Sequence, residues 1–296
     1  MEDQVDVPRS YRLMGVVNVT PDSFSDGGAF LDPGKAIAHG RALVAEGADI
    51  LDVGGESTRP GAEPVGEAEE LRRVLPVVEG LAGEGLGVQV SIDTYKSAVA
   101  RAALEAGASL VNDVSAFRAD PDMAAVVAQS GADCCLMHMR GRPRTMQRAG
   151  GPRYKDVVDD VRAFLEERLE LAVREGVAAE RILLDPGIGF GKTEEHNLEL
   201  LRRLDELLRI GRPIVIGTSR KSFLGRILAR AAGREEPVDV ADRLAGTIAT
   251  NVLAYERGAS VFRVHDVAPV REALAVAAAT LGGRWTARST GTTPAS

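Results

Sequence analysis

Eight short apolar runs alternate with helical stretches along this chain of 296 residues, and this alternation limits its possible folds. The runs lack the polar–apolar alternation of half-exposed strands, so they fit parallel strands that are covered on both faces. Strands that alternate with helices predict an α/β protein, and eight units favour a closed (β/α)8 TIM barrel. A doubly wound open sheet is the alternative. The runs are residues 13–19, 49–53, 88–92, 109–114, 134–139, 181–184, 213–217 and 260–264.

The junctions that lead into the strands repeat one design. Four glycines precede an alanine and then a polar residue beside the next run: Gly47, Gly107, Gly131 and Gly258. Glycine can end a helix in the left-handed conformation, so each junction predicts a helix end. Asp32 is predicted to cap a helix that begins at Pro33. Apolar periodicity predicts further helices over residues 154–175 and 195–209.

The length of the chain suits a single domain. A barrel of this kind takes about 250 residues, and no linker interrupts the pattern. We expect the barrel to span residues 13–283, with an N-terminal extension over residues 1–12. Residues 284–296 are small and polar, which predicts a disordered tail.

Composition excludes several classes of protein. The net charge of −7 argues against a nucleic-acid partner. No apolar run approaches the roughly 20 residues that would span a membrane, and residues 1–12 lack the apolar stretch of a secretory signal. We therefore expect a cytoplasmic protein.

Cys134 and Cys135 are adjacent, which suits neither an ordinary disulfide nor a metal site, so both are predicted to be small core residues.

Polar side chains follow every predicted strand, at the end of a barrel where active sites lie. Four of them suit a phosphate-rich anion: Arg59, Lys221, Arg263 and His265. Three others suit a flat heterocycle whose edge carries paired N–H donors: Asp93, Asn112 and Asp185. His138 and Arg140 follow the fifth predicted strand and belong to the same set of polar side chains at the strand exits. The mouth is therefore predicted to bind a polar ring that is joined to an anion.

Two glycine-rich loops leave these exits. Residues 20–28 have the composition of a lid that closes over substrate, and residues 54–61 carry Arg59. Residues 187–193 resemble a phosphate-binding P-loop, but Pro186 stands where that motif requires its first glycine. Nucleotide binding by this segment is therefore not predicted.

Taken together, the exit segments resemble those of the dihydropteroate synthase family. They occur in the expected order over residues 13–280, and the ordered set is far more specific than any one segment. The matching segments are residues 15–28 (GVVNVTPDSFSDGG), 52–62 (DVGGESTRPGA), 91–94 (SIDT), 112–115 (NDVS), 137–140 (MHMR), 185–192 (DPGIGFGK), 217–222 (GTSRKS) and 263–266 (RVHD).

The resemblance implies a reaction and a role for each site residue. The family joins 4-aminobenzoate to (7,8-dihydropterin-6-yl)methyl diphosphate and releases diphosphate. The implied pterin ligands are Asp93, Asn112, Asp185 and Lys221, and the implied diphosphate ligands are Thr58, Arg263 and His265. Asn18 would bind Mg2+, the expected cofactor. The implied 4-aminobenzoate contacts are Phe24, Thr58, Arg59, Pro60, Phe190 and Ser222. The implied catalytic residues are Asp26 on the lid, Lys221, Arg263 and His265.

The chemistry that the resemblance implies needs no strong general base, because an aromatic amine is unprotonated near neutral pH. The site must instead stabilise the departing diphosphate, and such donors are typically worth about 3–4 kcal/mol each. Homodimers are usual in the family, and sulfonamides compete with 4-aminobenzoate there. Two positions depart from the family pattern: Ala116 replaces a common glycine, and Gly151 replaces a frequent asparagine.

Two other functions fit parts of the pattern. A pterin-dependent methyltransferase would keep the pterin ligands but has no need of residues 20–28 or 217–222. A non-catalytic paralogue would bind pterin without turnover, and the intact Asn18, Asp26 and Lys221 argue against it.

Overall fold

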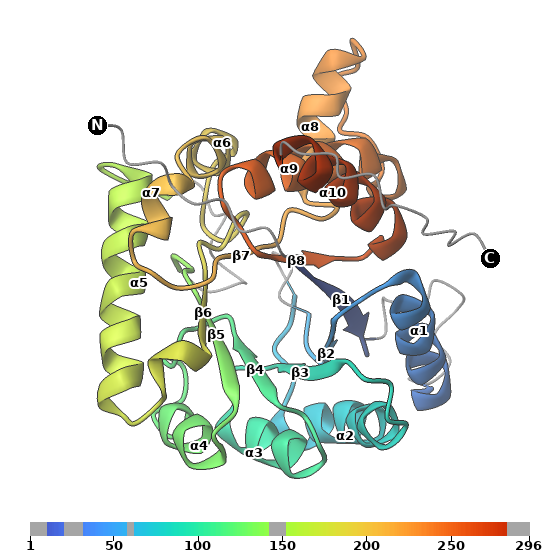
Figure 1. Cartoon of the computed structure of the whole chain (residues 1–296), viewed down its shortest axis with the longest axis vertical. Helices are drawn as coiled ribbons and strands as arrows, with labels where there is room; N and C mark the ends of the chain where they lie inside the picture. The colour runs from blue at the N-terminus through green and yellow to red at the C-terminus, as the bar shows by residue number, and fades with distance from the viewer. Residues whose placement is uncertain (1–10, 21–31, 58–61, 142–151, 283–296) are drawn as a thin grey trace, which may run out of the picture.

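The structure is a computed structural model that describes residues 11–20, 32–57, 62–141 and 152–282. Within these ranges eight parallel strands form one sheet, and helices surround it (Figure 1). The strands are β1 (Arg12–Asn18), β2 (Ile50–Gly54), β3 (Gln89–Asp93), β4 (Leu110–Asp113), β5 (Asp133–Met137), β6 (Ile182–Asp185), β7 (Val215–Ile216) and β8 (Val261–Val264). Residues 1–10 and 283–296 lie outside the described ranges, so the extension and the tail stay predictions.

The sheet closes on itself. Its strand order is β6-β5-β4-β3-β2-β1-β8-β7, and a parallel bridge between Leu184 and Ile214 joins its two ends. An open doubly wound sheet has two free edges, whereas closure removes them. The predicted TIM barrel is therefore confirmed.

The helices follow the strands as predicted, with one exception. They are α1 (Pro33–Glu46), α2 (Glu67–Gly83), α3 (Ser97–Glu105), α4 (Met123–Ser130), α5 (Val157–Arg174), α6 (Glu194–Arg202), α7 (Asp205–Leu208), α8 (Ser222–Ala231), α9 (Leu244–Glu256) and α10 (Val267–Leu281). The prediction of a single helix over residues 195–209 was wrong. The chain leaves the helical conformation at Arg203 (φ −112°, ψ 31°), whose guanidinium bonds Asp156 and Glu206.

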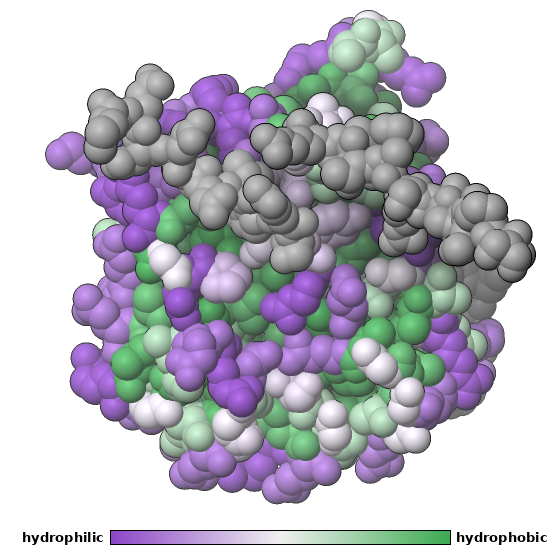
Figure 2. Space-filling model, viewed as in Figure 1, coloured by the Kyte–Doolittle hydropathy of each residue, from purple (hydrophilic) through white to green (hydrophobic). Residues whose placement is uncertain are grey.

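Hydrophilic residues occupy much of the rim seen in Figure 2, as expected for the outer faces of such helices.

The predicted helix ends are confirmed at the Gly-Ala junctions. All four glycines have positive φ angles, from 66° at Gly131 to 108° at Gly107. At Gly258 a Cβ atom would lie 2.3 Å from Cδ1 of Leu208, whose side chain would have to shift, and the positive φ of 94° is what requires glycine there. Asp32 caps α1 as predicted, since its carboxylate accepts the N–H of Gly34.

Two apolar layers hold the barrel. The larger one fills the space between strands and helices. The smaller one lies inside the barrel and consists of Met14, Ile50, Leu110, Cys135, Leu183, Val215 and Val261. Cys134 belongs to the outer layer and Cys135 to the inner one, and both are free thiols that are fully buried. Their prediction as core residues is confirmed.

Ala116 lies in a tight turn after β4, at the position where the family commonly has glycine. Ala116 and Phe117 both have positive φ angles (54° and 61°), and the buried Asp113 carboxylate accepts the N–H groups of Ser115 and Phe117. A residue with a Cβ is strained in this conformation. The alanine is fully buried, so its methyl group also contributes packing.

We expect Ala116→Val to destabilise the protein by about 2 kcal/mol or more, because a β-branched side chain is poorly tolerated at positive φ and overfills the core. Ala116→Gly is the matched control. It relieves about 1 kcal/mol of strain and loses about 1 kcal/mol of methyl burial, so it should be nearly neutral. Urea unfolding measures both, and a harmless valine would contradict the strain argument.

No helix in the described ranges is long and apolar enough to cross a membrane.

Candidate active site

A hydrogen-bonded network joins three strand exits around one buried carboxylate. Arg263 of β8 donates from Nε to Asp52 Oδ2 (2.6 Å) and from Nη2 to Asp93 (2.7 Å). Asn112 of β4 donates to the same Asp52 oxygen (3.0 Å), and Ser91 donates to the other one (2.6 Å). The fold therefore brings the predicted Asp93, Asn112 and Arg263 together. Asp52 was missed as a functional candidate.

The opposite side of the mouth carries Asp185 and Lys221. Asp185 ends β6 and accepts the N–H of Gly187 (2.6 Å), and Lys221 precedes α8. Burial raises the pKa of Asp185, and the nearby Lys221 opposes this shift. Burial lowers the pKa of Lys221 to about 8, and Asp185 opposes that shift in turn. The two charges thus influence each other, although they form no direct ion pair among the described residues.

Gly217 connects the two sides. A Cβ atom at Gly217 would lie 3.8 Å from Cβ of Arg263 and 4.0 Å from Nζ of Lys221. Lys221 also donates to the carbonyl of Ile188, and its Nζ lies 4.6 Å from the ring centroid of Phe190. Lys221, Arg263 and Phe190 therefore line one mouth.

Asp52, Asp93 and Arg263 place opposite charges in direct contact in this mouth. Burial raises the pKa of Asp93, and the bonded Arg263 opposes the shift. Burial alone would lower the pKa of Arg263, but the carboxylates of Asp52 and Asp93 outweigh it, and the pKa is raised. Arg263 is therefore a permanent cation that is held between two acids.

His265 has a fixed partner beside this network. Ser219 Oγ accepts the backbone N–H of His265 (3.1 Å) and lies 3.0 Å from its Nδ1. When the hydroxyl donates to Nδ1, the neutral ring carries its proton on Nε2. His265 can then offer a donor to an anion.

An apolar cluster lies next to the acids. Val114, Met137 and Met139 form it, with Tyr95 and Phe190 packed against them. Met137 is the direct neighbour of Asp185 in the β5–β6 register. These side chains can cover the faces of a flat ring. Phe190 was predicted as a site residue, whereas Val114, Met137, Met139 and Tyr95 were missed. The alternation of Met137 and Met139 around His138 was the available signal.

His138 does not belong to the ring of ligand groups, and this expectation was wrong. Its Nδ1 lies 2.8 Å from Nζ of Lys192, and both side chains are buried. Burial, reinforced by Lys192, lowers the pKa of His138 to about 2, so the ring is neutral. Arg140 lies against the ring of Tyr154 and pairs with Asp160.

The lysine of the P-loop-like segment, Lys192, bonds acceptors of the protein itself. Lys192 Nζ bonds His138 Nδ1 (2.8 Å), the carbonyl of Gly187 (2.9 Å) and that of Phe190 (3.2 Å). The carbonyl of His138, at 3.4 Å, is a fourth and weaker acceptor, so all three N–H groups of an ammonium are engaged. A Cβ at Gly187 would lie 1.8 Å from the carbonyl of His138. Glycine at this position thus allows the loop to pack closely against the end of β5.

The other predicted site residues are placed only in part. Asn18 is the last residue of β1 and is half-buried, and Ser222 is the exposed first residue of α8. The remaining ones lie outside the described residues: Phe24, Asp26, Thr58, Arg59 and Pro60, together with the departure at Gly151. Within the described part of the chain, no cluster of three His, Cys, Asp or Glu side chains could hold a metal.

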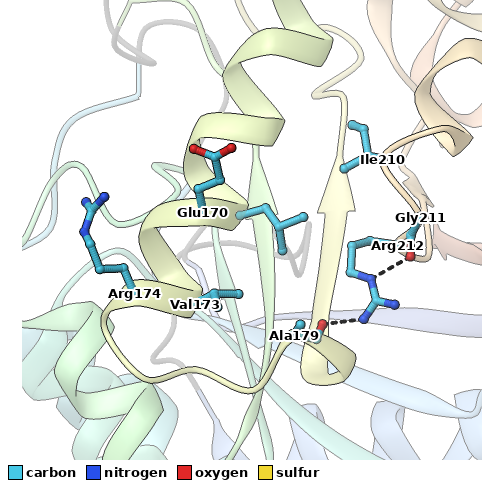
Figure 3. A pocket seen from close by; sticks show the side chains of 8 residues that line it. Glu170, Val173, Arg174, Ala179, Ile210, Gly211 and Arg212 are labelled. Atoms are coloured by element: carbon cyan, nitrogen blue, oxygen red, sulfur yellow. Dashed lines mark hydrogen bonds between the residues drawn. The ribbon is translucent and has the colours of Figure 1, made fainter.

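A groove of about 510 Å3 lies far from this mouth (Figure 3). It runs between α5 and the turn before β7, where Arg212 donates to the carbonyls of Ala179 and Gly211. Ala179 precedes β6, so the groove lies at the amino ends of the strands. It is separate from the polar exits.

Comparison with known proteins agrees with this arrangement. The model of the pterin binding enzyme family matches residues 14–265. The dihydropteroate synthase of Mycobacterium leprae is 50% identical over 272 residues, which cover 91% of this chain and 93% of that protein. The enzyme of Escherichia coli is 43% identical and covers 92% of each. The chain belongs to the dihydropteroate synthase family.

Solved structures of dihydropteroate synthases share the fold. The Yersinia pestis enzyme with a sulfonamide drug complex superposes with a TM-score of 0.85 at 42% identity, covering 94% of this chain and 97% of that one. The Xanthomonas albilineans enzyme with 4-aminobenzoic acid gives 0.83 at 45% identity, covering 93% and 94%. Family membership makes the chain a transferase of folate biosynthesis, so the predicted enzyme class and function are confirmed.

Proposed function

We propose that the mouth of this barrel carries out the family reaction with the residues predicted from the sequence. It joins 4-aminobenzoate to (7,8-dihydropterin-6-yl)methyl diphosphate, giving 7,8-dihydropteroate and diphosphate. One observation carries the assignment: Arg263 bonds Asp93 on one side and flanks Lys221 across Gly217 on the other. The residues that would bind a polar ring therefore lie next to a cation that would bind its leaving group.

The pterin would lie between the acids and the apolar cluster. Asp185 and Asp93 can accept N–H donors from the ring edge, Asn112 can accept or donate, and Lys221 can donate to a ring acceptor. Val114, Met137 and Met139 supply apolar contact to its faces. A Xanthomonas albilineans relative has been solved in complex with 7,8-dihydropteroate, which supports pterin as the ligand class.

The diphosphate would meet Arg263, His265 and Thr58. Asn18 is the ligand proposed for Mg2+, and its side-chain oxygen suits an ion that keeps most of its water. Asn18 ends β1, which pairs with β8, the strand that leads to His265. Mg2+ would neutralise charge on the departing diphosphate. Arg263 and His265 stabilise that charge as the bond to the pterin methylene breaks.

The 4-aminobenzoate would lie against Phe190 and near Ser222. The remaining contacts proposed for it are Phe24, Thr58, Arg59 and Pro60, with Asp26 on the lid. The amine attacks without a strong base, so the protein's main task is to orient it. The sulfonamide complex of the Yersinia pestis relative supports competition by sulfonamides at this subsite.

We also propose a cytoplasmic homodimer without nucleic-acid or membrane partners.

The test of function is direct. The purified chain is incubated with the pterin diphosphate, 4-aminobenzoate and Mg2+, and dihydropteroate is measured by chromatography. Product that depends on both substrates supports the proposal. Tight pterin binding without product would instead favour the non-catalytic paralogue.

The pKa of Lys221 gives a pH prediction. Because this pKa is lowered to about 8, the ammonium loses its proton as the pH rises through that value. We therefore expect kcat/KM for the pterin diphosphate, which reports groups of the free enzyme, to fall above pH ~8. Lys221→Arg stays charged, so its weaker activity should lack this decline. A decline at the same pH in both enzymes would assign it to another group.

A further inference from the structure

We propose that Asp52 is a positioning residue for this reaction: its buried carboxylate holds Arg263 and Asn112 in the orientations that the pterin diphosphate requires. The inference rests on the proposed function and deepens it. Asp52 lies in the middle of β2, and its side chain is fully buried. It therefore acts through its neighbours, without touching substrate.

Both carboxylate oxygens of Asp52 are engaged. Oδ1 accepts the hydroxyl of Ser91, and Oδ2 accepts Arg263 Nε and Asn112 Nδ2. The three donors come from β3, β4 and β8, so one side chain ties together three strands around the barrel. Two of these donors belong to proposed substrate ligands.

The contact with Asp52 fixes which edge of Arg263 faces the ligand. Asp52 takes Nε and Asp93 takes Nη2, which pins the guanidinium plane at two points. Within the described residues Nη1 makes no hydrogen bond to the protein. Its two N–H groups are thus available to diphosphate oxygens. Without Asp52 the guanidinium would pivot on a single contact with Asp93.

The same carboxylate sets the amide orientation of Asn112. A carboxylate accepts hydrogen bonds only, so the Asn112 atom that faces Asp52 must be the NH2 group. The amide oxygen then points away from Asp52 and can accept an N–H of the pterin. Asp52 thereby determines that Asn112 presents an acceptor to the ring.

The experiment compares Asp52→Asn with Ser91→Ala. An asparagine keeps the shape but not the charge. With its oxygen toward Arg263 and Asn112 it loses the charge assistance of both bonds, and with its NH2 group toward them it opposes both. We expect kcat/KM for the pterin diphosphate to fall about 100-fold, as for a small misplacement of binding groups. Ser91→Ala removes a donor from the same carboxylate but leaves both ligand residues in place. It should retain most of the activity.

Two further measurements separate positioning from a general loss of structure. Binding of inorganic diphosphate, measured by calorimetry, should weaken in Asp52→Asn and persist in Ser91→Ala, whether or not turnover occurs. In an Arg263→Ala background, Asp52→Asn should cost much less than in the wild-type enzyme, because part of its effect passes through Arg263.

Three results would overturn the proposal. One is an Asp52→Asn enzyme that binds diphosphate like wild type. Another is a loss that multiplies fully with that of Arg263→Ala. The third is a loss that urea unfolding explains by a smaller folded fraction. A wild-type chain without turnover would refute the proposed function alone, since diphosphate binding still reports on Asp52.

Discussion

Replacing Asp185 by alanine is expected to lower kcat/KM for the pterin diphosphate by about 10³-fold while the barrel stays folded. The ring edge of a pterin offers paired N–H donors, and a buried carboxylate is their natural acceptor. Each charge-assisted hydrogen bond is worth about 1.5–3 kcal/mol, so losing two costs roughly two to four powers of ten in rate. Asp185 also lies near Lys221, which would lose its opposing charge.

Steady-state kinetics with each substrate varied separately would measure this effect. The loss should fall mainly on the pterin diphosphate, because 4-aminobenzoate is assigned to Phe190 and Ser222. Asp185→Asn is the closest variant in shape and should also fail, since its NH2 group repels an N–H donor. Glu170→Ala, in the exposed groove at the other end of the barrel, is the matched control and should behave like wild type. Wild-type turnover by Asp185→Ala would refute the pterin assignment.

A linked change in pH dependence is expected in the same variant. Asp185 raises the pKa of Lys221 against the effect of burial. Removing the carboxylate should therefore lower that pKa further. The decline of kcat/KM with rising pH should then begin below pH ~8 in whatever activity remains.

The fold followed from the sequence because it rests on local patterns. Apolar runs without alternation mark buried parallel strands, and glycine before alanine marks helix ends. The bounds of all eight strands fall within two residues of the predicted runs, but β7 has only two residues. Val215 and Ile216 alone pair with β8 there, while Ile214 bridges to β6.

The site was only partly predictable, because its contacts join residues that are distant in the chain. Polar side chains at strand exits pointed to Asp93, Asn112, Asp185, Lys221 and Arg263. The position of Asp52 in the middle of a strand gave no such signal. Its bond to Arg263 spans 211 positions, and only the closed barrel brings β8 into line with β2.

His138 illustrates the opposite error. Its place at an exit favoured a ligand role, yet α5 and residues 187–192 cover it. Its ring packs edge-on against Phe164 of α5, 4.8 Å between centroids, and its Nδ1 bonds Lys192, 54 positions away. Burial of one exit residue by a neighbouring loop leaves no trace in local sequence.

Lys192 is the basis of the second large effect, on stability. The buried ammonium joins the exit of β5, through His138, to the loop after β6, through the carbonyls of Gly187 and Phe190. Lys192→Ala leaves a cavity and removes the donor to His138 Nδ1 and to the carbonyls of His138, Gly187 and Phe190, of which that of Gly187 still accepts the N–H of Phe190. Each unsatisfied group costs about 1–3 kcal/mol, and truncating a buried side chain of this size costs about 2–5 kcal/mol.

Part of this cost is offset, because burying the ammonium itself is unfavourable, as its strongly lowered pKa indicates. We therefore expect Lys192→Ala to lower the free energy of unfolding by about 3 kcal/mol. Lys192→Met keeps the volume but not the donors, so its loss should be smaller, about 1–2 kcal/mol. Urea unfolding at neutral pH distinguishes the two. Equal losses would mean that the hydrogen bonds matter and the cavity does not. Two variants as stable as wild type would mean that desolvation of the ammonium cancels all that its bonds contribute.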